Sequence, residues 1–406
     1  MNTFLIIITS LLLDTAATQA YLQGQYGQSS MPIMGTEEGG FSVHAHSIYD
    51  INSVSRVFGE ASYSWAQSKG NQWVENADYE RLYPYLTCDT VGGGMRSEQY
   101  YFRGGYRMAK HHIIWHLALQ YRALQSYRSI DPRPKNKVAE LDVEGSAGYI
   151  GSRYAYSLMA QVGRYKQNND IAFYSELGNA MIYHLVQLND DYVRFAGDFV
   201  SSYYHGINAG ATFMLQPRSA GWLAALGYRY QSVTKELNSS TSTPIARLQT
   251  NIFSAKAGYA DTDWRIMLQA DYNLRRGTQY IYGDVTGNYY HLLLTSDNYN
   301  EQTLSCHLQG NYRLSLPVGY VNFAAELGYL HHFANIDISS EYRFAQLASY
   351  LTASQLNANL AIRYTFPLKG RFSWFIEPMA TYKHYFAAIP SNIFAWQVVF
   401  KTGVSF

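Results

Sequence analysis

The chain ends with the stretch Phe394 to Phe406, which reads F-A-W-Q-V-V-F-K-T-G-V-S-F. Counting back from the end, every second residue is apolar except one: Phe406, Val404, Thr402, Phe400, Val398, Trp396 and Phe394. The residues between them are mostly small or polar: Ser405, Gly403, Lys401, Val399, Gln397 and Ala395. Side chains of a β-strand alternate between two faces. The stretch therefore predicts a strand with one apolar side and one polar side.

The composition narrows the class of protein. The chain has 406 residues, among them 38 Tyr and 7 Trp, with 15% charged residues and a net charge of +1. A soluble protein usually carries about 25% charged residues. Low charge with many aromatic residues is typical of a surface that faces lipid between two aromatic girdles. No basic block or stripe appears, which argues against nucleic-acid binding.

The two-residue period of the last strand returns along most of the chain. One apolar run is Tyr100, Phe102, Gly104, Tyr106 and Met108, with arginines on the opposite face. From residue 55 onward the period predicts fourteen strands, each of roughly ten or more residues, enough to cross a membrane at a tilt. An even number of strands places both ends of the chain on the same side of the membrane. The last strand is expected to close the barrel against the strand near Arg56–Trp65.

The predicted connections alternate in length. The long ones are 68–97, 125–137, 166–202, 236–244, 279–300 and 333–351, with a shorter one at 387–393. The tight ones follow Lys110, Gly151, Gln216, Asp261, Ser315 and Pro367. A soluble β-sandwich also alternates its side chains, but it need not sort its connections in this way. The sequence therefore favours an all-β, transmembrane, antiparallel up-and-down β-barrel with short periplasmic turns and long extracellular loops.

The connection at 166–202 leaves the number of strands open. Ile171 to Tyr174 and Met181 to Leu188 are apolar enough to pair with other strands. A barrel of sixteen strands, or a hairpin that stands above the membrane, would account for them. We prefer fourteen because neither stretch alternates cleanly.

The N-terminal residues predict two segments outside the barrel, which spans 55–406. Residues 1–20 fit a signal peptide with an apolar core at Phe4–Leu13, cut after Ala20 or after Ala17. Asp14 and the lack of a basic residue before the core leave a buried apolar strand as the alternative. Residues 21–54 are polar and rich in glycine, without a clear period. They are expected to form a periplasmic segment or to lie in the lumen.

Charged residues on the polar faces of the strands are expected to line the lumen. They are Arg103, Arg107, Arg122, Glu140, Asp142, Glu144, Arg229, Lys256, Arg265, Asp271, Arg275, Arg313, Glu326, Arg363, Glu377, Lys383 and Lys401. Basic residues outnumber acidic ones in this set. Two hypotheses follow: the charges pair and hold the wall in shape, or they line a water-filled pore that favours anionic or neutral polar solutes.

The sequence does not predict a catalytic, metal or cofactor site. His116 is expected to point inward, and no serine stands out as its partner. The pairs His44 and His46, and His331 and His332, lack a further ligand for a metal. No disulfide is expected, because Cys306 lies on the lipid-facing side of its strand and Cys88 in an external loop.

The sequence pattern of the strands resembles that of a known protein family. The residues that carry the likeness are the Tyr-rich alternation, G-Y-R-Y at Gly227–Tyr230, G-N-Y-R-L at Gly310–Leu314, and the final G-V-S-F. Over roughly 55–406 the chain resembles an uncharacterised family of Bacteroidetes outer-membrane β-barrel proteins, known only as a domain of unknown function. The resemblance implies the bacterial outer membrane and contact with its lipid and lipopolysaccharide. It also implies that Phe406 is an assembly signal for the barrel-assembly machinery. It implies no activity.

Two functions are compatible with these observations. The first is a porin-like or transport-related channel for small polar or anionic solutes, or an accessory barrel of an envelope uptake complex that works with a surface lipoprotein. The alternative is a structural or interaction barrel whose lumen is filled and whose extracellular loops bind a partner protein or glycan. An enzyme is not expected. The solute, the partner and the oligomeric state cannot be read from the sequence.

Overall fold

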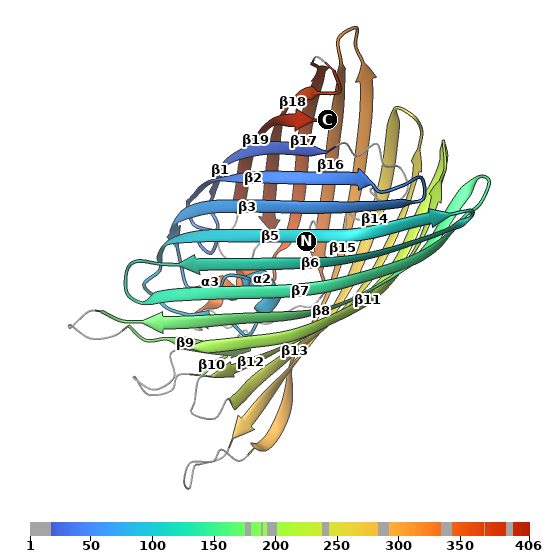
Figure 1. Cartoon of the computed structure of the whole chain (residues 1–406). Coiled ribbons are helices and arrows are strands. Elements are labelled where there is room, and N and C mark those ends of the chain that lie inside the picture. The colour runs from blue at the N-terminus through green and yellow to red at the C-terminus, as the bar shows by residue number, and fades with distance from the viewer. Residues whose placement is uncertain are drawn as a thin grey trace.

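The computed structural model describes residues 18–174, 180–187, 190–192, 201–237, 243–282, 292–333, 343–368, 370–386 and 393–406. Within them sixteen antiparallel strands form one closed barrel, and each strand pairs with its neighbours in chain order (Figure 1). The strands of the wall are β1 (Gln19–Ser29), β2 (Glu37–Asp50), β3 (Ser55–Asn71), β5 (Gly93–Lys110), β6 (Ile113–Tyr127), β7 (Arg133–Ile150), β8 (Tyr154–Ala172), β11 (Ser202–Pro217), β12 (Gly221–Leu237), β13 (Thr243–Ala260), β14 (Trp264–Tyr282), β15 (Leu292–Ser315), β16 (Tyr320–His332), β17 (Ser354–Pro367), β18 (Ser373–Phe386) and β19 (Ile393–Ser405).

The alternation read from the sequence is the alternation between the two faces of the wall. In β6, Ile113, Leu117 and Leu119 are exposed on the outside, whereas Ile114 and Ala118 are buried on the inside. An apolar side chain on the outside of a closed barrel has no protein core to pack against. A belt of such residues matches the lipid-facing surface of transmembrane barrels.

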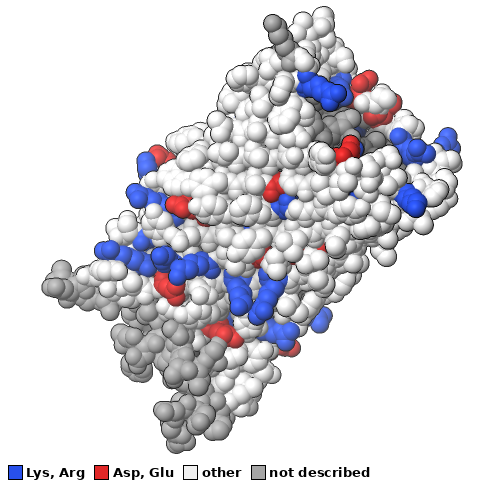
Figure 2. All heavy atoms as spheres, viewed as in Figure 1, with Lys and Arg blue, Asp and Glu red and all other residues white. Residues whose placement is uncertain are grey.

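This apolar outer surface runs around the barrel. Large apolar side chains stand exposed on neighbouring strands, for example Leu158 and Val162 in β8, Leu226 in β12 and Leu268 in β14. Uncharged residues cover most of the face drawn in Figure 2, and its charged side chains stand toward the two ends and in a basic group near the centre. Among the described residues, none of the helices has the length and hydropathy of a membrane span.

The longest connections lie at one end of the barrel, as predicted, although the one predicted at 125–137 has only residues 128–132 between its strands. Short turns join β5 to β6, β7 to β8, β11 to β12, β13 to β14 and β15 to β16 at one end of the barrel. The same end holds Gln19 and Ser405, which are paired in the sheet. The long connections lie at the opposite end, here called the outer end. Short turns on the periplasmic side and long loops outside are the usual arrangement of outer-membrane barrels.

The fold class is confirmed, with sixteen strands instead of the preferred fourteen. The two extra strands come from residues 21–54, so the prediction that this segment lies outside the wall is wrong. β1 does alternate between its two faces, and its outward residues Leu22 and Tyr26 are exposed. Glycine at Gly24 and glutamines on the inward face hid this period. The ladders on both sides of β1 and β2 stabilise them through backbone hydrogen bonds whatever their side chains.

The closing pair of strands also differs from the prediction. β19 pairs with β18 and with β1, from Gln19 opposite Ser405 to Ser29 opposite Ala395. The stretch Arg56–Trp65 lies in β3 and pairs with β2 and β5 instead. The expected partner was wrong because the two N-terminal strands stand between β3 and β19.

The described part of 166–202 adds no further strand to the wall. β8 continues to Ala172, and the next described residues form β9 (Tyr183–Gln187) and β10 (Asp190–Tyr192). These two strands and β4 (Thr87–Cys88) make a small separate sheet. Of the two alternatives for this connection, the hairpin outside the wall matches the described residues.

The predicted signal peptide lies almost wholly outside the described residues. Of residues 1–20, only 18–20 are described, and Gln19 and Ala20 are the first residues of β1. A cut after Ala20 would remove both from the ladder with β19. A cut after Ala17 would leave β1 whole.

Candidate functional site: a segment folded into the barrel

The connection between β3 and β5, residues 72–92, folds into the barrel. It contains α2 (Tyr79–Leu82) and β4, and we call it the plug segment. Leu82, Tyr85, Leu86 and Cys88 in it are all at most 2% exposed. Figure 1 shows α2 within the ring of strands, behind β6 and β7. The plug segment thus fills part of the lumen near the outer end.

The inward folding follows from the sequence of the segment. Between Trp73 and Asp89 it reads W-V-E-N-A-D-Y-E-R-L-Y-P-Y-L-T-C-D, which is too apolar and aromatic for a loop that stays in water. Its apolar side chains join one hydrophobic cluster with inward residues of the wall, among them Tyr165, Tyr204 and Val233. Burial of this surface is the main force that holds the segment inside.

A second inward element packs on the same cluster. It is α3 (Ala345–Leu351), in the connection between β16 and β17. Phe344 and Leu347 are each 1% exposed, and the ring of Tyr350 lies 5.8 Å from that of Trp73 in the plug segment. The ring of Phe344 lies 5.3 Å from that of Tyr183 in β9. Several connections therefore share one core at the outer end.

Three polar clusters fix the plug segment to the wall. In the first, Arg122 of β6 donates two hydrogen bonds to the carboxylate of Asp78, at 2.6 and 3.2 Å. Arg81 forms an ion pair of 2.6 Å with Glu140 of β7, which also contacts Arg122. The hydroxyl of Tyr165 donates to Asp78 at 3.0 Å.

The pKa of Asp78 reports on this first cluster. Burial would raise the pKa of its carboxyl group, but the hydrogen bonds from Arg122 and the charges of Arg122 and Arg81 hold that pKa below its usual value. Asp78 therefore stays ionised in its buried position.

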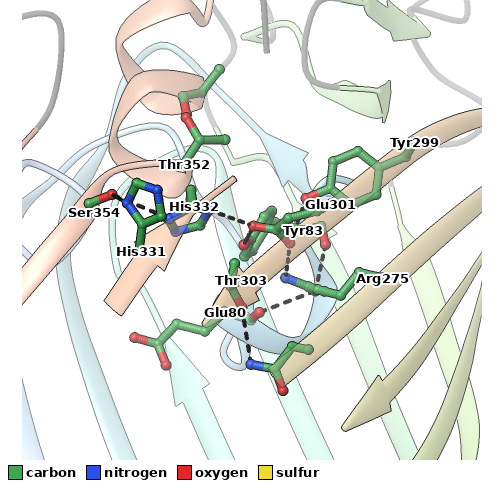
Figure 3. Close-up of polar contacts among 12 residues, drawn as sticks. Glu80, Tyr83, Arg275, Tyr299, Glu301, Thr303, His331, His332, Thr352 and Ser354 are labelled. Carbon is green, nitrogen blue, oxygen red and sulfur yellow. Dashed lines mark hydrogen bonds and ion pairs between the residues drawn. The ribbon is translucent and has the colours of Figure 1, made fainter. Parts of the chain in front are cut away.

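The second cluster joins the plug segment to β14, β15 and β16 (Figure 3). Tyr83 donates its hydroxyl proton to Glu301 at 2.6 Å, and Arg275 donates to the carbonyl oxygen of Tyr83 at 2.8 Å. Arg275 also lies 3.3 Å from the Glu301 carboxylate. Tyr299 donates to the same carboxylate at 2.9 Å, and Nδ1 of His332 lies 2.9 Å from it.

Glu301 is thus fully buried and surrounded by four partners. A buried carboxylate is costly unless it is paired and hydrogen-bonded, and here it is both. Removal of one partner would leave part of that cost unmet.

The third cluster lies at the two ends of the plug segment. Arg128, just beyond β6, forms ion pairs with both Glu75 and Asp89. Asn136 of β7 and Asn169 of β8 donate to the carbonyl oxygen of Glu75 at 2.7 and 2.9 Å. One arginine therefore holds the start and the end of the segment together.

Close contacts also position the middle of the segment. Lys235 of β12 is 1% exposed and donates to the carbonyl oxygen of Leu86 at 2.6 Å. The hydroxyl of Tyr85 reaches Asn298 at 2.9 Å by passing over Gly277 of β14. A Cβ atom at position 277 would overlap that hydroxyl, so glycine is needed there.

The structure places the predicted lumen residues on the inward faces, with different degrees of exposure. Arg103, Asp142, Glu144, Lys256 and Arg275 are buried, and Arg313 is exposed beside a short turn. Those between these extremes are Arg107, Arg122, Glu140, Arg229, Arg265, Asp271, Glu326, Arg363, Glu377, Lys383 and Lys401. Arg122, Glu140 and Arg275 hold the plug segment. A role of the others in solute passage stays a prediction.

Several of the remaining charges pair across the wall. Glu377 lies 3.0 Å from Lys401 and 3.7 Å from Arg363, which the positions on neighbouring strands predicted. Arg103 and Glu144 form a buried pair at 3.0 Å, and Glu326 contacts His307 at 2.8 Å. The inward face away from the plug segment is therefore polar, and part of its charge is compensated by these pairs.

Sequence reasoning missed the acidic residues of the plug segment, which are Glu75, Asp78 and Asp89. It treated 68–97 as an external loop. The available indication was the combination of a long apolar run with acidic residues inside one connection. Inward arginines on the strands beside it, such as Arg122, were recognised but not matched to it.

The other candidate residues stay apart from any reactive arrangement. His116 is buried and stacks on the ring of Phe58, with centroids 5.4 Å apart. Neither Cys88 nor Cys306 forms a disulfide in the described structure. In the part of the chain that the structure describes, no group of three or more His, Cys, Asp or Glu residues could hold a metal ion.

A closed antiparallel barrel with an apolar outer belt, a charged inward face and sorted connections is a bacterial outer-membrane β-barrel. The chain belongs to the family of unknown function DUF6850, whose model matches residues 8–402.

Comparison with other proteins adds no functional detail. No curated protein matches the sequence at a significant level. Among solved structures, the chain is similar to CdiB from Acinetobacter baumannii with a TM-score of 0.45 and 9% identity, covering 96% of this chain and 60% of that one. It is similar to a Pseudomonas aeruginosa FadL homologue with a TM-score of 0.44 and 10% identity, covering 96% and 90%. A bacterial polysaccharide outer membrane secretin gives a TM-score of 0.42 at 8% identity, covering 96% and 98%. This chain thus spans less than two thirds of the length of CdiB.

Proposed function

We propose that the protein is a transport-related outer-membrane channel whose resting state is closed by the plug segment. The observation that carries the proposal is the way the segment is held. Ion pairs and hydrogen bonds to the wall fix it at Asp78, Tyr83 and Glu75. Polar contacts of this kind can be exchanged for water or for a ligand's groups when the segment moves. The passage would serve small polar or anionic solutes, because the inward face carries more basic than acidic residues.

Conductance across a planar bilayer tests the proposal. The purified wild-type protein is expected to conduct little. A variant with residues 74–90 replaced by a short Gly-Ser linker is expected to form steady open pores with a mild preference for anions. A linker variant that stays closed would contradict the proposal. A wild-type protein that is steadily open would show that the plug segment does not close the lumen.

The alternative is a barrel that serves structure or interaction and never opens. The core shared by the plug segment, α3 and β9 favours it, because this core is extensive and deeply buried. In that case the linker variant would conduct, but no ligand, voltage or pH would open the wild-type protein. Binding of a surface lipoprotein, a partner protein or a glycan to the outer loops is the corresponding partner hypothesis.

Three further expectations from the sequence remain proposals: the origin of the protein, a role without catalysis, and the role of Phe406. We infer a Bacteroidetes origin from the Tyr-rich strand style, and a role without catalysis from the lack of a suitable group around His116. Recognition of Phe406 by the barrel-assembly machinery belongs here too. The ring of Phe406 packs against Phe372, with centroids 5.6 Å apart, and is half exposed.

A further inference from the structure

One group of cations stands on the outside of the barrel, away from the lumen. It consists of Lys135 and Lys137 on β7 and Arg164 and Lys166 on β8, all exposed, and we call it the basic patch. Lys166 is paired in the sheet with Ala139, two positions from Lys137, so Lys137 and Lys166 are diagonal neighbours on one face. Arg164 and Lys135 extend this row on either side, with Arg164 opposite Leu141 and Lys135 opposite Asp170. Figure 2 shows basic side chains gathered over this part of the surface.

The patch begins where the apolar belt ends. The outward residues of β8 are Tyr154, Tyr156, Leu158, Ala160 and Val162, followed by Arg164 and Lys166. Arg164 is ten positions from Tyr154, which at about 3.3 Å per residue and a tilt of about 40° gives a height of roughly 25 Å. That is the usual height of the apolar band of such barrels. The patch therefore lies at the outer interface, at the depth of the lipid headgroups.

Aromatic residues usually occupy this depth. On β6 Tyr121 is exposed, and its register runs through Leu141 of β7 to Arg164 of β8. On β8 a cation thus stands at this level, and on β7 Lys137 and Lys135 follow toward the outer end.

The charges of the patch are poorly compensated within the protein. Lys137 lies 3.7 Å from Asp170. Among the described residues, no ion pair or side-chain hydrogen bond involves Lys135, Arg164 or Lys166. Like charges on neighbouring strands are destabilising unless an anion lies between them. We propose that the basic patch binds the phosphate groups of the anionic glycolipid in the outer leaflet.

Binding of lipid A tests this assignment. The purified full-length protein in detergent would be titrated with bisphosphorylated lipid A, and with the same lipid after removal of its phosphates, and bound lipid would be counted by native mass spectrometry. The wild-type protein is expected to prefer the phosphorylated lipid by at least about tenfold, since each cation near an anionic surface contributes to binding. The triple variant K137Q/R164Q/K166Q is expected to lose that preference.

The matched control removes three exposed cations from the short-turn end, as K110Q/R153Q/R218Q. It has the same net charge as the patch variant and is expected to bind like the wild-type protein. Heat-dependent gel migration would verify that each variant is a folded barrel. Equal affinity of the patch variant and the control would overturn the proposal, and so would equal binding of both lipids by the wild-type protein. Displacement of lipid A by an equal concentration of inorganic phosphate would overturn the headgroup assignment in favour of a free anion.

Discussion

Tyr83 and Glu301 lie 218 positions apart in the sequence and meet in a hydrogen bond of 2.6 Å inside the barrel. The bond joins the plug segment to β15. In the ring of strands, β15 stands across the barrel from β3 and β5, which flank that segment. It is one of the contacts that hold the segment inside the barrel.

Replacement Tyr83→Phe should weaken this attachment. Glu301 would keep Arg275, Tyr299 and His332 but lose one donor, and a hydrogen bond to a charged group contributes about 1.5–3 kcal/mol. Backbone amides in residues 74–90 should then exchange their hydrogens faster, by the factor that this loss of free energy implies. Tyr79→Phe is the control, because the described structure contains no hydrogen bond from the Tyr79 hydroxyl. Equal exchange in the two variants would argue against a holding role of the bond.

Replacement Gly277→Ala should displace the plug segment by steric overlap. The added Cβ would meet the hydroxyl of Tyr85 and the side chain of Tyr299. Overpacking of this kind costs typically 1–3 kcal/mol. The variant should conduct more often in a planar bilayer than the wild-type protein. Gly310→Ala, at a position where a Cβ meets nothing within 4 Å, should behave like the wild-type protein.

The closed state should weaken in acid. The pKa of Asp78 is depressed below its usual value of about 3.8, so its ionised form stabilises the folded plug segment at higher pH. That contribution should be complete above roughly pH 5 and should be lost as the pH falls below 4 through the depressed pKa. Conductance measured from pH 7 to pH 3 should rise at the acidic end.

The variant Asp78→Asn separates this effect from general acid denaturation. Asparagine cannot ionise, so the variant should open more often than the wild-type protein at pH 7 and should show a smaller change with pH. A wild-type profile and a variant profile of the same shape would exclude Asp78 as the group responsible.

The mature N-terminus should be residue 18. β1 begins at Gln19, and the amide of Phe406 donates to the carbonyl oxygen of Thr18 at 2.9 Å. A cut after Ala17 preserves these contacts, and a cut after Ala20 removes them. N-terminal sequencing of the protein purified from membranes distinguishes the two, and a start at Tyr21 would show that the ladder survives without its first residues.

The barrel could be predicted from the sequence because its outer face has a strict chemical requirement. Every second residue must be apolar where lipid is adjacent, and this requirement is visible in stretches such as Phe394–Phe406. β1 and β2 escaped because Gly24 and Gly39 interrupt the outward face, and backbone pairing on both sides does not need an apolar side chain at each position. Whether β1 and β2 join the wall therefore depends on pairing with adjacent strands rather than on their own sequence pattern.

The candidate site was less predictable for a different reason. Arg122, Glu140 and Arg275 were recognised as inward residues, since alternation gives the face of a strand. Their partners Asp78 and Tyr83 lie in a connection, where no period indicates direction. Which loop enters a lumen depends on how its apolar surface fits the whole ring of strands, and Gly277 shows how specific that fit is.

The pairing of Gln19 with Ser405 gives the chain a property that its linear order conceals. β1 and β19 are adjacent in one ladder, so a short peptide could join Gln19 to Ser405 without moving a strand. The ring could then be opened at any outer connection to give a circular permutant with the same wall. The order in which the strands leave the ribosome is thus not a requirement of the final ring.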